Sequence, residues 1–78
     1  MTKITKIQNY FFSALYINGY LYSMGEDVSK HLEELLLDNS GVEISFEVIS
    51  LDDEVVMSIM SKFAARFPNS LTDLQNEL

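Results

Sequence analysis

The sequence contains no cysteine and no tryptophan, and it has only one proline and three glycines in 78 residues. The lack of cysteine excludes disulfides and thiolate metal sites, and we expect a cytoplasmic protein. Because 47 % of the residues are hydrophobic, a disordered or low-complexity chain is also excluded. The first residues lack the apolar core of a signal peptide, and no apolar run approaches the ~18 residues of a membrane span. We expect one domain over residues 1–78.

Basic residues are scarce, with five Lys and Arg against twelve Asp and Glu, for a net charge of −7. The negative charge is concentrated in residues 26–54, which hold ten acids and a single lysine, whereas residues 1–25 carry only two lysines. A surface of this sign repels phosphate, so we expect no direct binding to nucleic acid or to an anionic membrane. Solubility alone explains an acidic surface. A partner protein with a basic surface is the more specific interpretation.

Residues 42–48, with the sequence VEISFEV, alternate apolar and polar side chains, which predicts a half-buried strand. The aromatic segments 11–17 and 20–24 flank Asn18-Gly19, the strongest short signal for a β-hairpin. These two segments are therefore the expected neighbours of the strand.

A helix over residues 4–17 is the alternative interpretation of the N-terminal third, with Gly19 as its C-terminal glycine. Its support is the helical spacing of Ile4, Ile7, Phe11 and Ala14. Aromatic and β-branched residues are poor helix formers, and only a hairpin supplies strand 42–48 with hydrogen-bonding partners. We therefore favour the hairpin.

Three helices are predicted, over about residues 28–38, 52–67 and 70–78. The first has an apolar stripe that includes Val28, Leu32, Leu35 and Leu36, and the second ends at Pro68. The candidate N-caps are Asp27 for the first helix, Ser50 or Asp52 for the second, and Asn69 or Ser70 for the third.

The predicted fold is a small α+β domain with the element order β-β-α-β-α-α. Its three-stranded mixed sheet has the strand order 2-1-3, with the helices on one face. The hairpin is apolar on both faces, so the uncovered face would be aromatic. An exposed patch of this kind is larger than monomers usually tolerate, which predicts a homodimer. The residues of the predicted dimer face are Tyr10, Phe12, Tyr16 and Leu21.

No catalytic constellation is recognisable. His31 is the only histidine and has no second base nearby in sequence. The run Asp52-Asp53-Glu54 lacks the spacing and glycine of a calcium loop, and it suits the N-terminus of a helix. We therefore expect no enzyme activity, no cofactor and no metal.

These observations favour a small acidic protein-binding module that inhibits or regulates a basic partner, for example a nucleic-acid-binding protein. Inhibitors encoded by phages and other mobile elements have this general character. The alternative is a homodimeric structural or assembly protein without inhibitory activity. The predicted binding residues are the acids Glu26, Glu33, Glu34, Asp38, Glu43 and Glu47 and the aromatic residues Tyr10, Phe12, Tyr16, Tyr20 and Tyr22.

Overall fold

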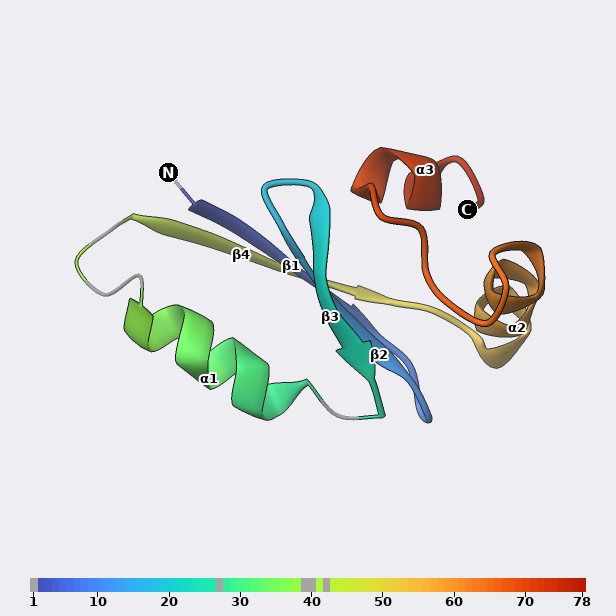
Figure 1. Cartoon of the computed structure of the whole chain (residues 1–78), viewed down its shortest axis with the longest axis horizontal. Coiled ribbons are helices and arrows are strands. Elements are labelled where there is room, and N and C mark those ends of the chain that lie inside the picture. Colours follow the sequence, from blue (N-terminus) through green and yellow to red (C-terminus); the bar gives the residue numbers. More distant parts are fainter. Residues whose placement is uncertain (1, 27, 39–40, 42) are drawn as a thin grey trace.

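The computed structural model describes residues 2–26, 28–38, 41 and 43–78, which form a small α+β fold of four strands and three helices (Figure 1). The molecule is elongated, with extents of 38 × 22 × 18 Å. The strands are β1 (Thr2–Gln8), β2 (Ser13–Ile17), β3 (Tyr20–Gly25) and β4 (Ile44–Ser50). The helices are α1 (Ser29–Asp38), α2 (Asp53–Lys62) and α3 (Leu71–Gln75).

The sheet is mixed and has the strand order β3-β2-β1-β4. The β2–β3 hairpin is confirmed, and the alternative helix over residues 4–17 is wrong. The three predicted strands, which are β2, β3 and β4, keep the relative order expected for them, but the sheet has four strands, because the unpredicted strand β1 lies between β2 and β4. β1 pairs antiparallel with β2 and parallel with β4, so β4 runs in the direction of β3, as a helical crossover requires.

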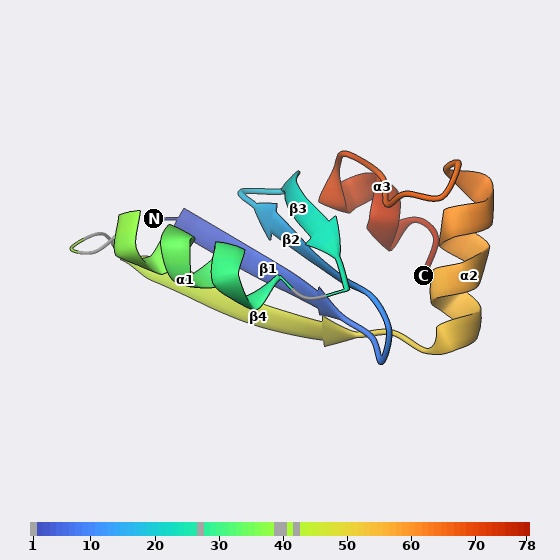
Figure 2. The ribbon, with the colours of Figure 1, turned by 60° about the horizontal axis from the view of Figure 1, so that its bottom comes forward.

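Helices cover both faces of the sheet, so the prediction that one face stays open is wrong. α1 packs on one face, where Leu35 lies in a cluster with Ile4 and Leu15. α2 and α3 pack on the other face, in a cluster that includes Ile7 and Tyr16. Figure 2 shows α1 beside the N-terminal part of β1 and β4, and α2 and α3 near the opposite end of these strands.

The helix ends differ in part from the sequence predictions. α2 ends at Lys62, so the chain up to Pro68 leaves the helix earlier than expected. Asp52 is the N-cap residue of α2, although its side chain makes no capping hydrogen bond. Ser70 caps α3 as predicted, and its hydroxyl accepts a hydrogen bond from Asp73 N at 3.1 Å. The predicted cap Asp27 lies outside the described residues, as do Val42 of the predicted strand and residues 39–40 of the predicted helix stop.

The β2–β3 turn has positive φ at both central residues, 50° at Asn18 and 88° at Gly19. This geometry is that of a two-residue hairpin turn whose twist matches the strands. Asn18 also joins the turn to β1, because Lys3 N donates to Asn18 Oδ1 at 2.9 Å and Asn18 N donates to Lys3 O at 2.8 Å. The turn therefore helps to set the register of β1.

Replacing Gly19 with valine should lower the free energy of unfolding by about 1–3 kcal/mol, because a β-branched residue resists positive φ. A Cβ atom at this position would meet nothing within 4 Å, so the loss comes from the backbone alone. Urea unfolding followed by circular dichroism measures it. Gly19→Asn is the control and should lose much less, since asparagine tolerates this conformation. Equal losses in both variants would contradict the turn.

Two alanines with positive φ follow the C-cap residue Phe63 of α2, with 58° at Ala64 and 64° at Ala65. Ala65 N donates to Met60 O at 2.6 Å. This bond spans five residues and corresponds to the 6→1 hydrogen bond of a Schellman motif. Glycine is the usual residue at the left-handed position, because a Cβ atom is disfavoured there. Ala64 therefore holds a strained backbone conformation.

Replacing Ala64 with glycine should raise the free energy of unfolding by about 1 kcal/mol, because the strain of the left-handed conformation is removed. Ser58→Gly, at an exposed position inside α2, is the matched control and should lower it by about 0.5–1 kcal/mol. Thermal unfolding of the two variants beside the wild type gives both values. A loss at position 64 would contradict the helix end described here.

Candidate protein-binding surfaces

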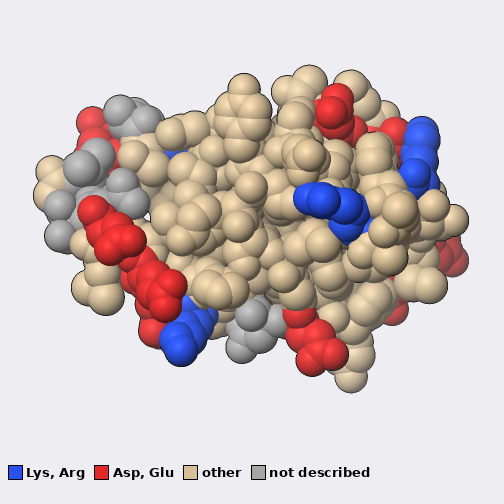
Figure 3. All heavy atoms as spheres, in the orientation of Figure 1, with Lys and Arg blue, Asp and Glu red and all other residues tan. Residues whose placement is uncertain are grey.

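The six predicted acidic binding residues that the structure describes are all exposed. They lie before or on α1 and at or in β4, and none of them forms an ion pair with another described residue. The ion pair found in the described part of the chain joins Lys62 and Glu77 at 2.8 Å, away from this group. Figure 3 shows a row of acidic side chains with one basic side chain beside it at the α1 end, further acidic side chains at the opposite end, and a largely uncharged surface between them. The six acids are Glu26, Glu33, Glu34, Asp38, Glu43 and Glu47.

The predicted aromatic residues fall into an exposed group and a buried group. Tyr10, Tyr20 and Tyr22 are exposed at 96 %, 70 % and 48 % of their surface. Tyr10 follows β1, and the other two lie on the edge strand β3, where a shift in register leaves Tyr22 without a partner in β2. These three tyrosines are therefore available to a partner.

Tyr16 and Phe12 belong to the core instead. Tyr16 is completely buried, and its hydroxyl donates to Pro68 O at 2.6 Å. The Phe12 ring lies 4.9 Å from the Phe67 ring, between centroids. Leu21 packs against the same cluster. The predicted open face of Tyr10, Phe12, Tyr16 and Leu21 is therefore wrong, because the connection between α2 and α3 and the two helices cover most of it.

Burial raises the pKa of the Tyr16 phenol from 10.0 to about 12, with a smaller lowering by the charge of Arg66 and a smaller raising by Asp73. The folded state therefore keeps this proton at pH values where the unfolded chain has lost it. The contribution of this pKa difference to the free energy of unfolding is fully present below pH 10 and is lost as pH rises towards 12.

The free energy of unfolding should fall by up to about 1.4 kcal/mol per pH unit above pH 10, and Tyr16→Phe should remove this contribution. At neutral pH the same variant should lose about 1–2 kcal/mol, because Pro68 O loses its buried donor. Urea unfolding at several pH values measures both effects. Tyr20→Phe, at an exposed position, is the control and should change neither. Equal slopes for Tyr16→Phe and the wild type would contradict the assignment.

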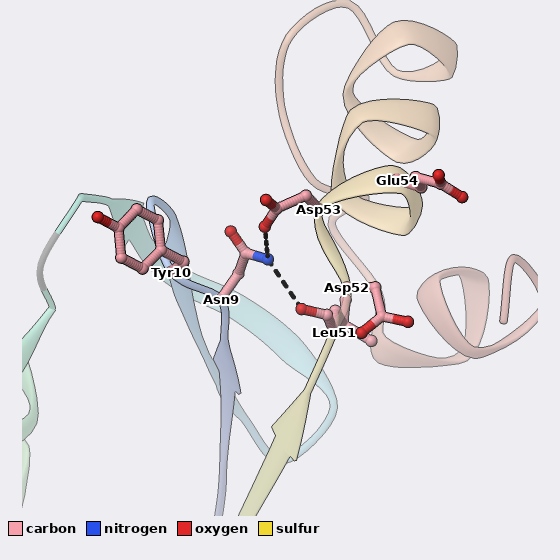
Figure 4. Close-up of a pocket in the computed structure, with 6 residues that line it drawn as sticks. All are labelled: Asn9, Tyr10, Leu51, Asp52, Asp53 and Glu54. Atoms are coloured by element: carbon pink, nitrogen blue, oxygen red, sulfur yellow. Dashed lines mark hydrogen bonds between the residues drawn. The ribbon is translucent and has the colours of Figure 1, made fainter.

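A hollow of about 530 Å³ lies between the β1–β2 turn and the start of α2, lined by Asn9, Tyr10, Leu51, Asp52, Asp53 and Glu54 (Figure 4). Asn9 Nδ2 donates to Leu51 O at 2.8 Å and to Asp53 Oδ1 at 3.0 Å. Its side-chain oxygen accepts from Phe11 N at 3.1 Å, which shapes the turn. The sequence assigns the three acids to the helix start. It does not reveal that Tyr10 lies beside them, because this depends on the pairing of β1 with β4.

Strand β4 exposes two apolar side chains that the sequence pattern places in the core. Phe46 and Val48 are 48 % and 47 % exposed, although they share with Ile4 the face that α1 covers. Ile44, on the same face, does pack against the α1 cluster. α1 has ten residues, which corresponds to ~15 Å, whereas the seven residues of β4 span ~23 Å. The apolar face of β4 is therefore longer than the helix available to cover it.

His31 lies on the exposed side of α1 and links it to β3. Its Nδ1 atom is 2.5 Å from Ser23 Oγ, a hydrogen bond in which either group can donate, depending on the tautomer. This contact gives the only histidine a structural role, the attachment of α1 to the hairpin.

Comparison with protein-family models, with curated proteins and with solved structures finds no match to this chain. Among the described residues, no three His, Asp or Glu side chains come together in a way that could hold a metal ion. No helix in the described ranges has the length and hydrophobicity needed to cross a membrane.

Proposed function

We propose that this protein is a small acidic binding module that occupies a basic surface of a partner protein and thereby inhibits or regulates it. The observation that carries the proposal is the group of six exposed carboxylates, none of which forms an ion pair with another described residue. Glu33, Glu34 and Asp38 lie on α1, Glu26 precedes this helix, and Glu43 and Glu47 lie at or in β4.

The exposed charges and the exposed tyrosines supply different parts of a binding reaction. Unneutralised carboxylates attract a basic protein from a distance and raise its association rate. Tyrosines bury a large surface with few rotatable bonds and act mainly on dissociation. Tyr20 and Tyr22 lie on β3 and provide such side chains. Neither group is needed for packing of the core, so a role in binding explains their presence.

A homodimeric structural protein is the second candidate. The prediction of a dimer depends on an open aromatic face, and α2 and α3 cover this face. Exposed Tyr10, Tyr20 and Tyr22 still provide surface for self-association. Sedimentation at micromolar concentration distinguishes a dimer from a monomer that needs a foreign partner.

Reversing two charges on α1, Glu33→Lys with Glu34→Lys, should lower the association rate with the partner about tenfold at low salt and flatten its salt dependence. The free energy of unfolding should change by less than about 0.5 kcal/mol, because both side chains are exposed. The partner is obtained by capture on the immobilised protein from the source cell and then purified. Stopped-flow kinetics at several salt concentrations give the rates.

Glu33→Gln with Glu34→Gln changes half as much charge and should give an intermediate rate. Tyr20→Ala with Tyr22→Ala is the complementary variant and should raise the dissociation rate with little effect on association. An association rate that is the same in all charge variants would restrict these acids to a role in solubility.

A further inference from the structure

The outer edge of β4 has unpaired backbone groups. Thr2 N donates to Glu43 O at 3.0 Å, and Leu51 N donates to Gln8 O at 2.9 Å, so odd-numbered residues of this segment bond to β1. In a parallel pair these bonds recur at every second residue, so the even-numbered residues 44–50 direct their N–H and C=O groups away from the sheet. Within the described part of the chain, no backbone or side-chain group pairs with them.

The opposite edge of the sheet is partly closed by the chain itself. Leu21 N donates to Asn69 O at 2.7 Å, and Leu71 N donates to Gly19 O at 2.7 Å. Residues 69–71 thus pair with the backbone at the start of β3. The edge of β4 is the one where an extended segment finds a row of free donors and acceptors next to exposed apolar side chains.

Charge determines which kind of strand fits this edge. Glu47 is exposed and lies on the face of β4 opposite to Phe46 and Val48. Glu43, also exposed, directly precedes β4 and continues this alternation, because its C=O bonds to Thr2 N. A second copy paired edge to edge would bring its own Glu43 and Glu47 close to these glutamates, and like charges across a strand pair are destabilising. A strand with basic residues on the glutamate face and apolar residues on the other face has favourable contacts on both.

We propose that β4 binds an extended segment of the partner as a fifth strand, in which lysine or arginine alternates with apolar residues. This inference rests on the proposed function and gives its mode of binding. The apolar residues of the segment pack on Phe46 and Val48, and its basic residues lie beside Glu43 and Glu47. The main-chain hydrogen bonds form with the even-numbered residues of β4.

The test uses a synthetic seven-residue peptide that alternates lysine with valine, blocked at both ends. Its control is the same peptide N-methylated at alternate amides, which keeps the charge and side chains but removes the donors. Fluorescence anisotropy should show at least tenfold weaker binding of the N-methylated peptide. Glu47→Lys should weaken binding of the unmodified peptide at least tenfold, whereas Glu54→Lys, the same charge change at an exposed position of α2, should weaken it less than threefold.

Amide hydrogen exchange gives a second readout that a purely electrostatic contact would not change. The amides of Phe46 and Val48 point outward, so they should exchange rapidly in the free protein and become at least tenfold slower when the peptide is bound. The amides of Ser45 and Glu47 bond to β1 and should be slow in both states. This alternation is specific to strand addition.

Three results would overturn the proposal. Equal binding of the two peptides would show a charge contact without an added strand. No peptide binding, together with a captured partner whose affinity is unchanged by Val48→Lys, would place the interface elsewhere. Protection of the Phe46 and Val48 amides in the free protein at high concentration only would show that a second copy covers the edge. In each case the effect of the α1 charge reversal on association with the partner still tests the proposed function by itself.

Discussion

The backbone hydrogen bonds of β1 hold the sheet together, because among the described strands it is β1 that pairs with both the β2–β3 hairpin and β4. β1 bonds antiparallel on one side and parallel on the other, and Ile4 and Ile7 are both completely buried. Each of the two helix layers packs on one of these isoleucines. Loss of β1 pairing would therefore expose unpaired strand edges and detach both layers at once.

The hairpin and the helices were predictable because their signals are local. Asn18-Gly19 predicts the turn by its φ preferences, and the spacing of apolar residues predicts the helices. β1 has no such signal. Its buried residues Ile4 and Ile7 are three apart and point to opposite faces, since α1 covers one end of the strand and α2 and α3 cover the other. Because the two ends of β1 are covered on opposite faces, its buried residues are spaced as they would be in a helix.

Among the candidate binding residues, exposure follows from the sequence where charge decides it and does not follow where packing decides it. The acids on α1 lie outward because the opposite side of the helix is apolar, and this follows from the sequence. The burial of Tyr16 depends on which face of the sheet α2 and α3 cover, which no local pattern determines. The exposure of Phe46 and Val48 depends on the length of α1 compared with β4. The alternation of apolar and polar residues along β4 correctly separates its two faces. It does not show how much of the apolar face α1 covers.

The arrangement places the acidic surface and much of the core at different ends of an elongated molecule. α2 and α3 pack on Ile7, Ala14 and Tyr16 at one end, whereas α1, which carries the exposed acids Glu33, Glu34 and Asp38, lies at the other. Repulsion among these acids acts on a part of the chain that is attached through a small cluster around Leu35. A basic partner that neutralises them would relieve this repulsion, so binding should stabilise α1 more than the region of α2 and α3. The charge that favours association is therefore also a local source of instability in the free protein.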